Sequence, residues 1–153
     1  MIISVLFSFV SACICISIAI EDFRFKTISV FKLLLLFLSL TAIRWNDILQ
    51  VEYYDQVFIN LLVVLLIILA IMIIGVRRKN GEARKQFGEG DVVLLFVGAV
   101  FFSTREYLEL LIGAAVLGII HGVIFQILRE YEKPQIPFGA YYIITFLVLL
   151  LIE

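Results

Sequence analysis

The sequence predicts an all-α integral membrane protein, a bundle of about six transmembrane helices with its amino terminus outside. Of its 153 residues, 63% are hydrophobic and 16% are charged, whereas soluble domains hold roughly 45 to 50% and 25%. The apolar residues gather in runs long enough to cross a bilayer. Runs such as residues 61–70 are continuously apolar and lack the alternation of β-barrel strands.

Hydropathy divides the chain, read as one domain of residues 1–153, into six spans. The first run continues beyond a lipoprotein-like box at Cys13 with no preceding Lys or Arg, which favours a permanent span over a cleaved signal. The second, fourth and sixth spans are shorter than the ~20 residues of a perpendicular helix, so we expect extended ends or a thinned bilayer. The six spans are residues 2–20, 28–43, 57–76, 92–103, 108–128 and 138–152.

Basic residues predict the orientation of these spans. Of the 12 Lys and Arg residues, only Arg44 and Arg105 fall in outer loops if the amino terminus is outside. The other ten then lie on the inner side, as the positive-inside rule requires. The inner loop 77–86 carries five of these cations, which predicts binding to anionic lipid head groups. A net charge of -1 argues against a nucleic-acid partner, which would need a basic surface.

Two aspartates are expected to meet at the inner face. Asp22 follows the apolar part of the first span, Asp91 precedes that of the fourth, and the sixth span begins at Phe138. All three positions fall on the inner side by parity, so the two carboxylates form a candidate acid/base pair. Acidic residues at span ends are also common as solvated interface residues, so position alone leaves both interpretations open.

The second aspartate has an unusual local sequence, Gly88-Glu89-Gly90-Asp91. The glycines offer freedom at positive φ and leave room for an extended peptide beside the carboxylate. A dinucleotide-binding fingerprint would need a further glycine where this chain has Val93.

These motifs resemble those of the prepilin and preflagellin leader peptidases, membrane aspartyl proteases with a Gly-x-Gly-Asp motif. The resemblance spans nearly the whole chain. It implies an endopeptidase that cleaves short leader peptides from pilin-like or flagellin-like precursors at the cytoplasmic face of a prokaryotic inner membrane, without metal or organic cofactor. It further implies that Asp22 and Asp91 are the catalytic pair. The motif residues around them are Gly88, Glu89, Gly90, Pro137, Phe138 and Gly139.

The chain departs from the family pattern in three ways. Residues 27–29 read Thr-Ile-Ser where Ile-Pro-Asn is typical, and Val93 replaces a lysine that many members carry. The sequence has two cysteines, Cys13 and Cys15, and therefore lacks the paired Cys-x-x-Cys motifs of the larger, methylating members. The resemblance is to the short, peptidase-only form.

Other functions fit parts of the same pattern. A small carrier or channel could use Asp22 and Asp91 as a proton or cation site, although such a site belongs nearer the midplane of the membrane. A noncatalytic relative acting as an assembly factor is the other alternative. Tyr54-Asp55 matches the partner motif of a different class of Gly-x-Gly-Asp protease, but parity puts Asp55 on the outer face. The sequence leaves the oligomeric state open.

Three aromatic or histidine side chains invite interpretation. His121, the only histidine, lies in the fifth span beside small residues at four-residue spacing, which favours an interhelical hydrogen bond over catalysis. Tyr141 and Tyr142, near the start of the sixth span, are expected to be interface anchors.

Helix ends predict different roles for the two aspartates. Asp22 follows a helix carboxyl end, whose partial negative charge disfavours a carboxylate, whereas Asp91 stands at an amino end, where unpaired N–H groups favour one. We therefore expect Asp91 to be the ionised base and Asp22 the protonated acid.

Overall fold

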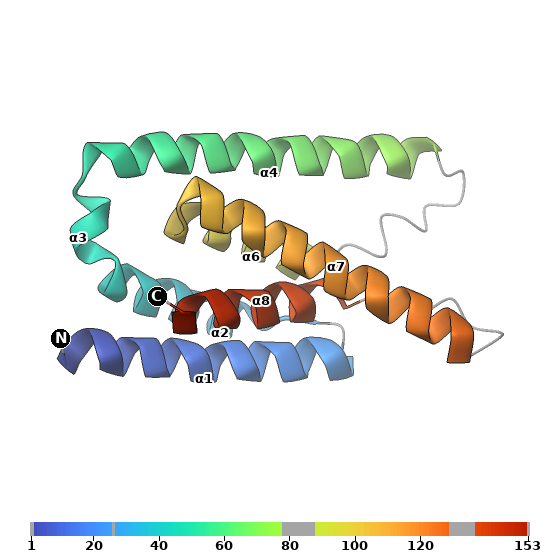
Figure 1. Cartoon of the computed structure of the whole chain (residues 1–153), viewed down its shortest axis with the longest axis horizontal. Helices are drawn as coiled ribbons and strands as arrows, with labels where there is room; N and C mark the ends of the chain where they lie inside the picture. The colour runs from blue at the N-terminus through green and yellow to red at the C-terminus, as the bar shows by residue number, and fades with distance from the viewer. Residues whose placement is uncertain (1, 26, 78–87, 129–136, 153) are drawn as a thin grey trace.

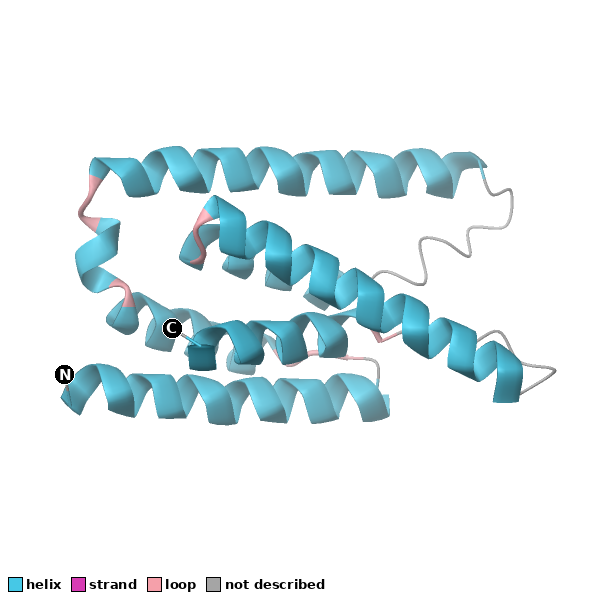
Figure 2. Cartoon of the chain, viewed as in Figure 1, coloured by secondary structure: helices cyan, strands magenta, loops and turns pink. Residues whose placement is uncertain are grey.

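A computed structural model describes residues 2–25, 27–77, 88–128 and 137–152, and these residues form helices joined by short connections (Figures 1 and 2). No strand occurs within these ranges. The helices are α1 (Ile2–Phe25), α2 (Val30–Ile43), α3 (Trp45–Ile48), α4 (Val51–Arg77), α6 (Glu89–Phe101), α7 (Thr104–Leu128) and α8 (Phe138–Ile152).

The helices follow the six predicted apolar segments but begin or end differently. The helix α4 starts six residues earlier than its apolar run, and α6 and α7 also begin in polar sequence. This is expected because main-chain hydrogen bonding continues into the polar flanks of an apolar helix. The short helix α3, between the second and third apolar segments, was not predicted. Residues 78–87, which carry most of the predicted lipid-binding loop, lie outside the described residues.

Three long helices and three short ones make up the bundle. The long helices contain the segments Leu6–Phe25, Val51–Ile73 and Thr104–Ile124, which are long and apolar enough to span a membrane. The helices α2, α6 and α8 have 14, 13 and 15 residues, a length of roughly 20 Å each against a hydrocarbon core of ~30 Å. The protein is thus a helical membrane protein, and six full crossings remain a prediction.

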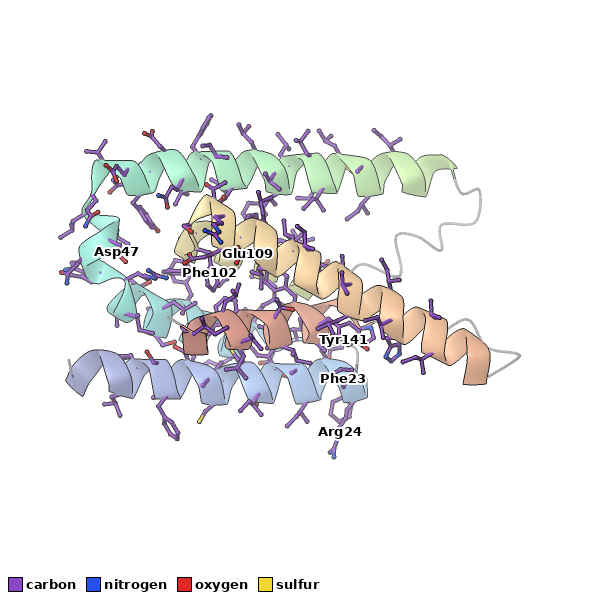
Figure 3. All side chains as sticks on the ribbon, in the orientation of Figure 1. Phe23, Arg24, Asp47, Phe102, Glu109 and Tyr141 are labelled. Atoms are coloured by element: carbon purple, nitrogen blue, oxygen red, sulfur yellow. The ribbon has the colours of Figure 1, made fainter. Side chains whose placement is uncertain are left out.

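Apolar side chains cover the outside of the bundle as well as its core (Figure 3). Val30, Leu66 and Ile119 are 79%, 66% and 65% exposed, a surface suited to lipid rather than water. Inside, α8 packs against α1 and α7, α1 packs against α2, and α4 packs against α6. Leu36 and Phe146 are completely buried among these helices.

Buried polar side chains connect helices where the main chain needs partners. The Asn60 amide on α4 donates to the carbonyl oxygens of Ala99 and Phe102, at 3.1 Å and 2.9 Å. These carbonyls lie at the carboxyl end of α6, where helical N–H partners run out. Ser11 on α1 donates to Ser39 on α2 at 2.8 Å. Such bonds matter in a bilayer because lipid offers no substitute partner.

The tyrosines at the start of α8 are not interface anchors, and that expectation was wrong. Tyr142 is fully buried and Tyr141 is 7% exposed. A methyl group on Gly98 of α6 would overlap the Tyr142 hydroxyl, so the missing side chain at Gly98 makes room for the phenol. The first turn of α8 lies inside the bundle because α1 and α7 pack on either side of it.

Candidate active site

Asp22 and Asp91 come together where α1 ends and where α6 and α8 begin. Their side chains are 6% and 8% exposed. A methyl group built on Gly139 of α8 would lie 2.8 Å from Asp91 Oδ1 and 3.2 Å from Asp22 Oδ2. The two oxygens are therefore separated by no more than the sum of these distances. The structure brings together the three segments that parity placed on one face; we call the two carboxyl groups the dyad.

Asp91 is held by the first turn of its own helix. Gly88 is the N-cap of α6, and its N–H donates to Asp91 Oδ2 at 3.0 Å. A carboxylate three residues into a helix often reaches back to the N-cap amide in this way. The contact leaves Oδ1 of Asp91 facing Gly139 and Asp22.

The first turn of α8 donates to both members of the dyad. The Pro137 carbonyl accepts the N–H of Tyr141 at 3.4 Å, so the N–H groups of the intervening residues have no partner within the helix. The N–H of Ala140 donates to Asp22 Oδ2 at 2.7 Å. The N–H of Gly139 donates to Asp91. One helix terminus thus binds both carboxylates through consecutive amides, as helix amino ends bind anions.

In the Gly-Glu-Gly-Asp motif, Gly90 serves close packing, and neither glycine has left-handed backbone geometry. Gly88 has φ of -78° and ψ of 158°, and Gly90 also lies outside the left-handed region, so the freedom that glycine has at positive φ is not used here. A methyl group on Gly90 would lie 2.9 Å from Ile28 Cβ. The room that Gly90 provides is therefore filled by Ile28, from the connection between α1 and α2. Glu89 between the glycines is exposed.

Burial dominates the electrostatics of Asp91, which stands just before the apolar stretch that begins at Val92. Loss of solvent raises the pKa of the Asp91 carboxyl from 3.8 to about 6. The N–H of Gly88 lowers that pKa, the charge of Asp22 raises it, and the N–H of Gly139 lowers it. Asp91 therefore holds a proton at a higher pH than an ordinary aspartate does.

In the structure, the position of each aspartate on its own helix does not decide which one is the acid and which the base. Asp22 lies in the last turn of α1, as expected, but it also accepts an N–H from the amino end of α8. Both carboxylates therefore have a helix amino terminus beside them. Burial and the charge of Asp22 both raise the pKa of Asp91, which opposes its ready ionisation, and two such interacting carboxyl groups titrate as one unit.

A sequence comparison identifies the family. A model of the type IV leader peptidase family matches residues 9–123, more than half of the chain. The chain belongs to the type IV leader peptidase family. The matched residues include Asp22 and Gly88 to Asp91 and end before α8. No curated protein and no solved structure matches the chain.

Around the dyad of this member of the leader peptidase family, α7 and α8 are joined by His121 and Tyr141. The Tyr141 hydroxyl hydrogen-bonds to His121 Nδ1, which confirms the predicted interhelical bond. The Tyr141 ring also meets Phe23 edge-on, with centroids 5.6 Å apart (Figure 3). Phe23 follows Asp22, and Tyr141 follows Ala140. The ring contact therefore stabilises the same two segments that the hydrogen bond from the Ala140 N–H to Asp22 connects.

Position 93 does not contact the dyad. Val93 is 43% exposed and faces away from the core, so replacing the lysine that many leader peptidases carry there leaves the contacts of Asp91 intact. Lys32 on α2 pairs instead with Glu21, the residue before Asp22, with Nζ 2.9 Å from Oε2.

Asp55 is separated from the dyad along the bundle. It lies on α4 just over one turn before Asn60, which binds the carboxyl end of α6, whereas Asp91 is near the amino end of α6. Over the ten residues between Asp91 and Phe101 an α-helix rises roughly 15 Å. The Tyr54-Asp55 pairing is therefore excluded by geometry, as parity predicted.

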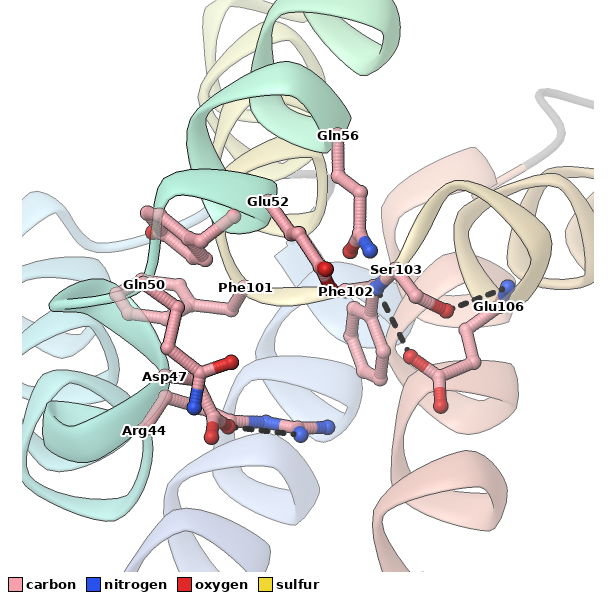
Figure 4. A pocket seen from close by; sticks show the side chains of 10 residues that line it. Arg44, Asp47, Gln50, Glu52, Gln56, Phe101, Phe102, Ser103 and Glu106 are labelled. Atoms are coloured by element: carbon pink, nitrogen blue, oxygen red, sulfur yellow. Dashed lines mark hydrogen bonds and ion pairs between the residues drawn. The ribbon is translucent and has the colours of Figure 1, made fainter.

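The end of the bundle opposite the dyad holds a polar pocket (Figure 4). Its volume is about 240 Å³, and Arg44, Asp47, Glu52, Gln56, Ser103 and Glu106 are among the residues that line it. Arg44 and Asp47 form an ion pair at 3.2 Å. Within the described ranges no three His, Cys, Asp or Glu side chains are placed to hold a metal ion.

Proposed function

We propose that this protein is an aspartic endopeptidase that cleaves the leader peptides of pilin-like or flagellin-like precursors at the cytoplasmic face of the inner membrane. The observation that carries the proposal is the approach of two buried carboxyl groups, from α1 and α6, to one point at Gly139. Membership of the leader peptidase family supports proteolysis. Pairing of Asp22 with Asp91 supports the aspartic type.

The chemistry follows from two carboxyl groups that share one proton. The ionised carboxylate takes a proton from a water molecule, and the water oxygen attacks the scissile carbonyl carbon. The protonated partner donates a hydrogen bond to the carbonyl oxygen, which gains negative charge. Collapse of the tetrahedral intermediate, with protonation of the leaving nitrogen, releases two peptides. Such proton transfer contributes roughly 10² to 10⁴ in rate, and fixed geometry supplies much of the remainder.

Main-chain amides prepare the dyad for this role. Gly88, Gly139 and Ala140 donate N–H bonds to the two carboxyl groups. These donors belong to helix ends, so they hold the carboxyl groups without long side chains that would have to be ordered. A preorganised pair requires little rearrangement when the substrate binds.

The position of the dyad favours proteolysis over transport. A transport site lies near the middle of a membrane, whereas Asp22 is three residues from the end of α1 and Asp91 is the third residue of α6. The noncatalytic alternative is less favoured because both carboxyl groups and their amide donors are present. The positive-inside distribution supports a dyad at the cytoplasmic face.

Cleavage by the purified protein tests the proposal. The wild-type protein in detergent is incubated with a pilin-like precursor, beside Asp91→Asn and the matched control Asp55→Asn, which changes an exposed aspartate at the other end of the bundle. Mass spectrometry should show one cut that removes the leader, made by wild type and Asp55→Asn but not by Asp91→Asn. The new amino terminus should carry no methyl group, since the proposed form is peptidase-only. Equal cleavage by Asp91→Asn would refute the proposal.

A further inference from the structure

Ile28 lies against Gly139, which lines the dyad, and against Gly90, which precedes Asp91. A methyl group on Gly90 would be 2.9 Å from Ile28 Cβ, and one on Gly139 would be 2.8 Å from Ile28 Cδ1. The same point on Gly139 is 2.8 Å from Asp91 Oδ1. The terminal methyl of Ile28 therefore stands next to the reactive face of Asp91, in a space too small for even one added carbon.

The connection that carries Ile28 is fixed on both sides. Lys32 on α2 pairs with Glu21 on α1 at 2.9 Å, so an ion pair closes the hairpin around it. Ser29 is the N-cap of α2, and its carbonyl accepts the N–H of Leu33 at 3.2 Å. Ile28 itself is half-buried. These contacts make it a defined wall of the site.

This wall restricts what can bind if the dyad acts as proposed. A scissile carbonyl must approach both carboxyl groups to within hydrogen-bond distance. The Cα atom of the residue that supplies this carbonyl is bonded directly to the carbonyl carbon, so its side chain projects into the space around the dyad. The glycines cannot retreat further, because they already have no side chain and pack against Ile28.

We infer that Ile28 is a specificity-determining residue, whose terminal methyl group limits the side chain immediately before the scissile bond to hydrogen or little more. The inference rests on the proposed peptidase function. It assigns the rejection of larger residues at that position to one side chain of the α1–α2 connection.

Two substitutions that shorten the Ile28 side chain by different amounts test its role. Ile28→Val removes the Cδ1 atom that approaches Gly139, and Ile28→Ala removes most of the wall. Val30→Ala is the matched control, since Val30 lies two residues away and is 79% exposed. Each protein is given precursors with Gly, Ala or Val before the scissile bond, and kcat/KM is measured for each.

The expected result is a change in preference rather than a general loss. One methylene group in a pocket is typically worth about 10- to 200-fold in discrimination. The Ala-to-Gly ratio of kcat/KM should therefore rise about tenfold in Ile28→Val and further in Ile28→Ala, and it should match wild type in Val30→Ala. A second set of precursors varies the residue after the scissile bond instead. The ratios of kcat/KM between these precursors should be the same in all four proteins.

The outcomes separate this inference from the proposed function. A wild-type protein that does not cleave the Gly precursor refutes the peptidase proposal itself. A cleaving wild type, with an Ala-to-Gly ratio unchanged in Ile28→Val and Ile28→Ala, overturns the role of Ile28. A shift in preference only at the residue after the bond would also overturn it.

Discussion

Gly139 is the residue at which both carboxyl groups, the amino end of α8 and Ile28 meet. Its N–H donates to Asp91, and its missing side chain leaves space for Asp91 Oδ1 and Asp22 Oδ2. The sequence marked this residue through its motif but gave no reason for a glycine. The reason is steric, and it involves atoms from three segments that are distant in the chain.

A Gly139→Ala substitution should therefore disable the dyad without unfolding the protein. The new methyl group would lie 2.8 Å from both Asp91 Oδ1 and Ile28 Cδ1, so one of them must move. A displacement of about 1 Å in an active site can cost 10²-fold in rate, and we expect a loss of that order in kcat. Gly113→Ala is the control, because the three atoms nearest to its methyl group would all belong to Thr145, away from the dyad. Full activity in Gly139→Ala would contradict the geometry described for this residue.

The raised pKa of Asp91 predicts an alkaline limit to activity. The pair works with one proton, so activity is lost when the second carboxyl group ionises. The pKa of Asp91 is raised to about 6, which means that it keeps its proton up to that pH and loses it above. We expect kcat/KM to fall along a limb with a pKa near 6, measured with a precursor that has no titrating group nearby. A limb near pH 4 would show that burial does not govern this carboxyl group.

At the scale of helices, the short and the long helices have different roles. The short helices α6 and α8 begin beside the dyad and supply Asp91 and the amides, while the long helices α4 and α7 flank them (Figure 1). Hydropathy predicted which helices are short. At the carboxyl end of the short helix α6, carbonyl groups lack helical N–H partners, and Asn60 of α4 donates hydrogen bonds to them.

Replacing Asn60 should loosen this end of the bundle. Asn60→Leu keeps a side chain of similar size but removes two donors, leaving buried carbonyl oxygens of Ala99 and Phe102 without them. An unsatisfied buried group costs roughly 1 to 3 kcal/mol, so the free energy of unfolding in detergent should fall by about that amount. Ile59→Leu, at a 47% exposed neighbour, should change it little. An unchanged stability in Asn60→Leu would show that the cap is dispensable.

At the scale of the whole molecule, the distribution of charge predicts the orientation. If the dyad faces the cytoplasm, a cysteine replacing Arg84 should react with a membrane-impermeant thiol reagent only from the cytoplasmic side. A cysteine replacing Gln50, in a background with Cys13 and Cys15 changed to serine, should react only from outside. Labelling of both from one side would refute the proposed topology and the site of cleavage with it.

The sequence predicted the helical class, the apolar segments and the meeting of Asp22 with Asp91. These predictions succeeded because hydropathy and the number of spans between two residues can be read directly from the order of residues in the chain. It did not predict that Ile28 lies against Gly90, nor that Ala140 donates to Asp22. Those contacts depend on how α1, α2, α6 and α8 pack, which periodicity does not encode. The predicted anchoring role of Tyr142 failed for the same reason.

The most direct test of the central claim measures whether Asp22 and Asp91 act as one catalytic unit. Cleavage of one precursor is followed by single-turnover mass spectrometry for wild type, Asp22→Asn, Asp91→Asn and the double variant. Groups that act together are strongly non-additive, so each single variant should lose as much activity as the double variant, with all four proteins folded and inserted. Substantial cleavage by either single variant, or separate and additive losses, would contradict the shared dyad.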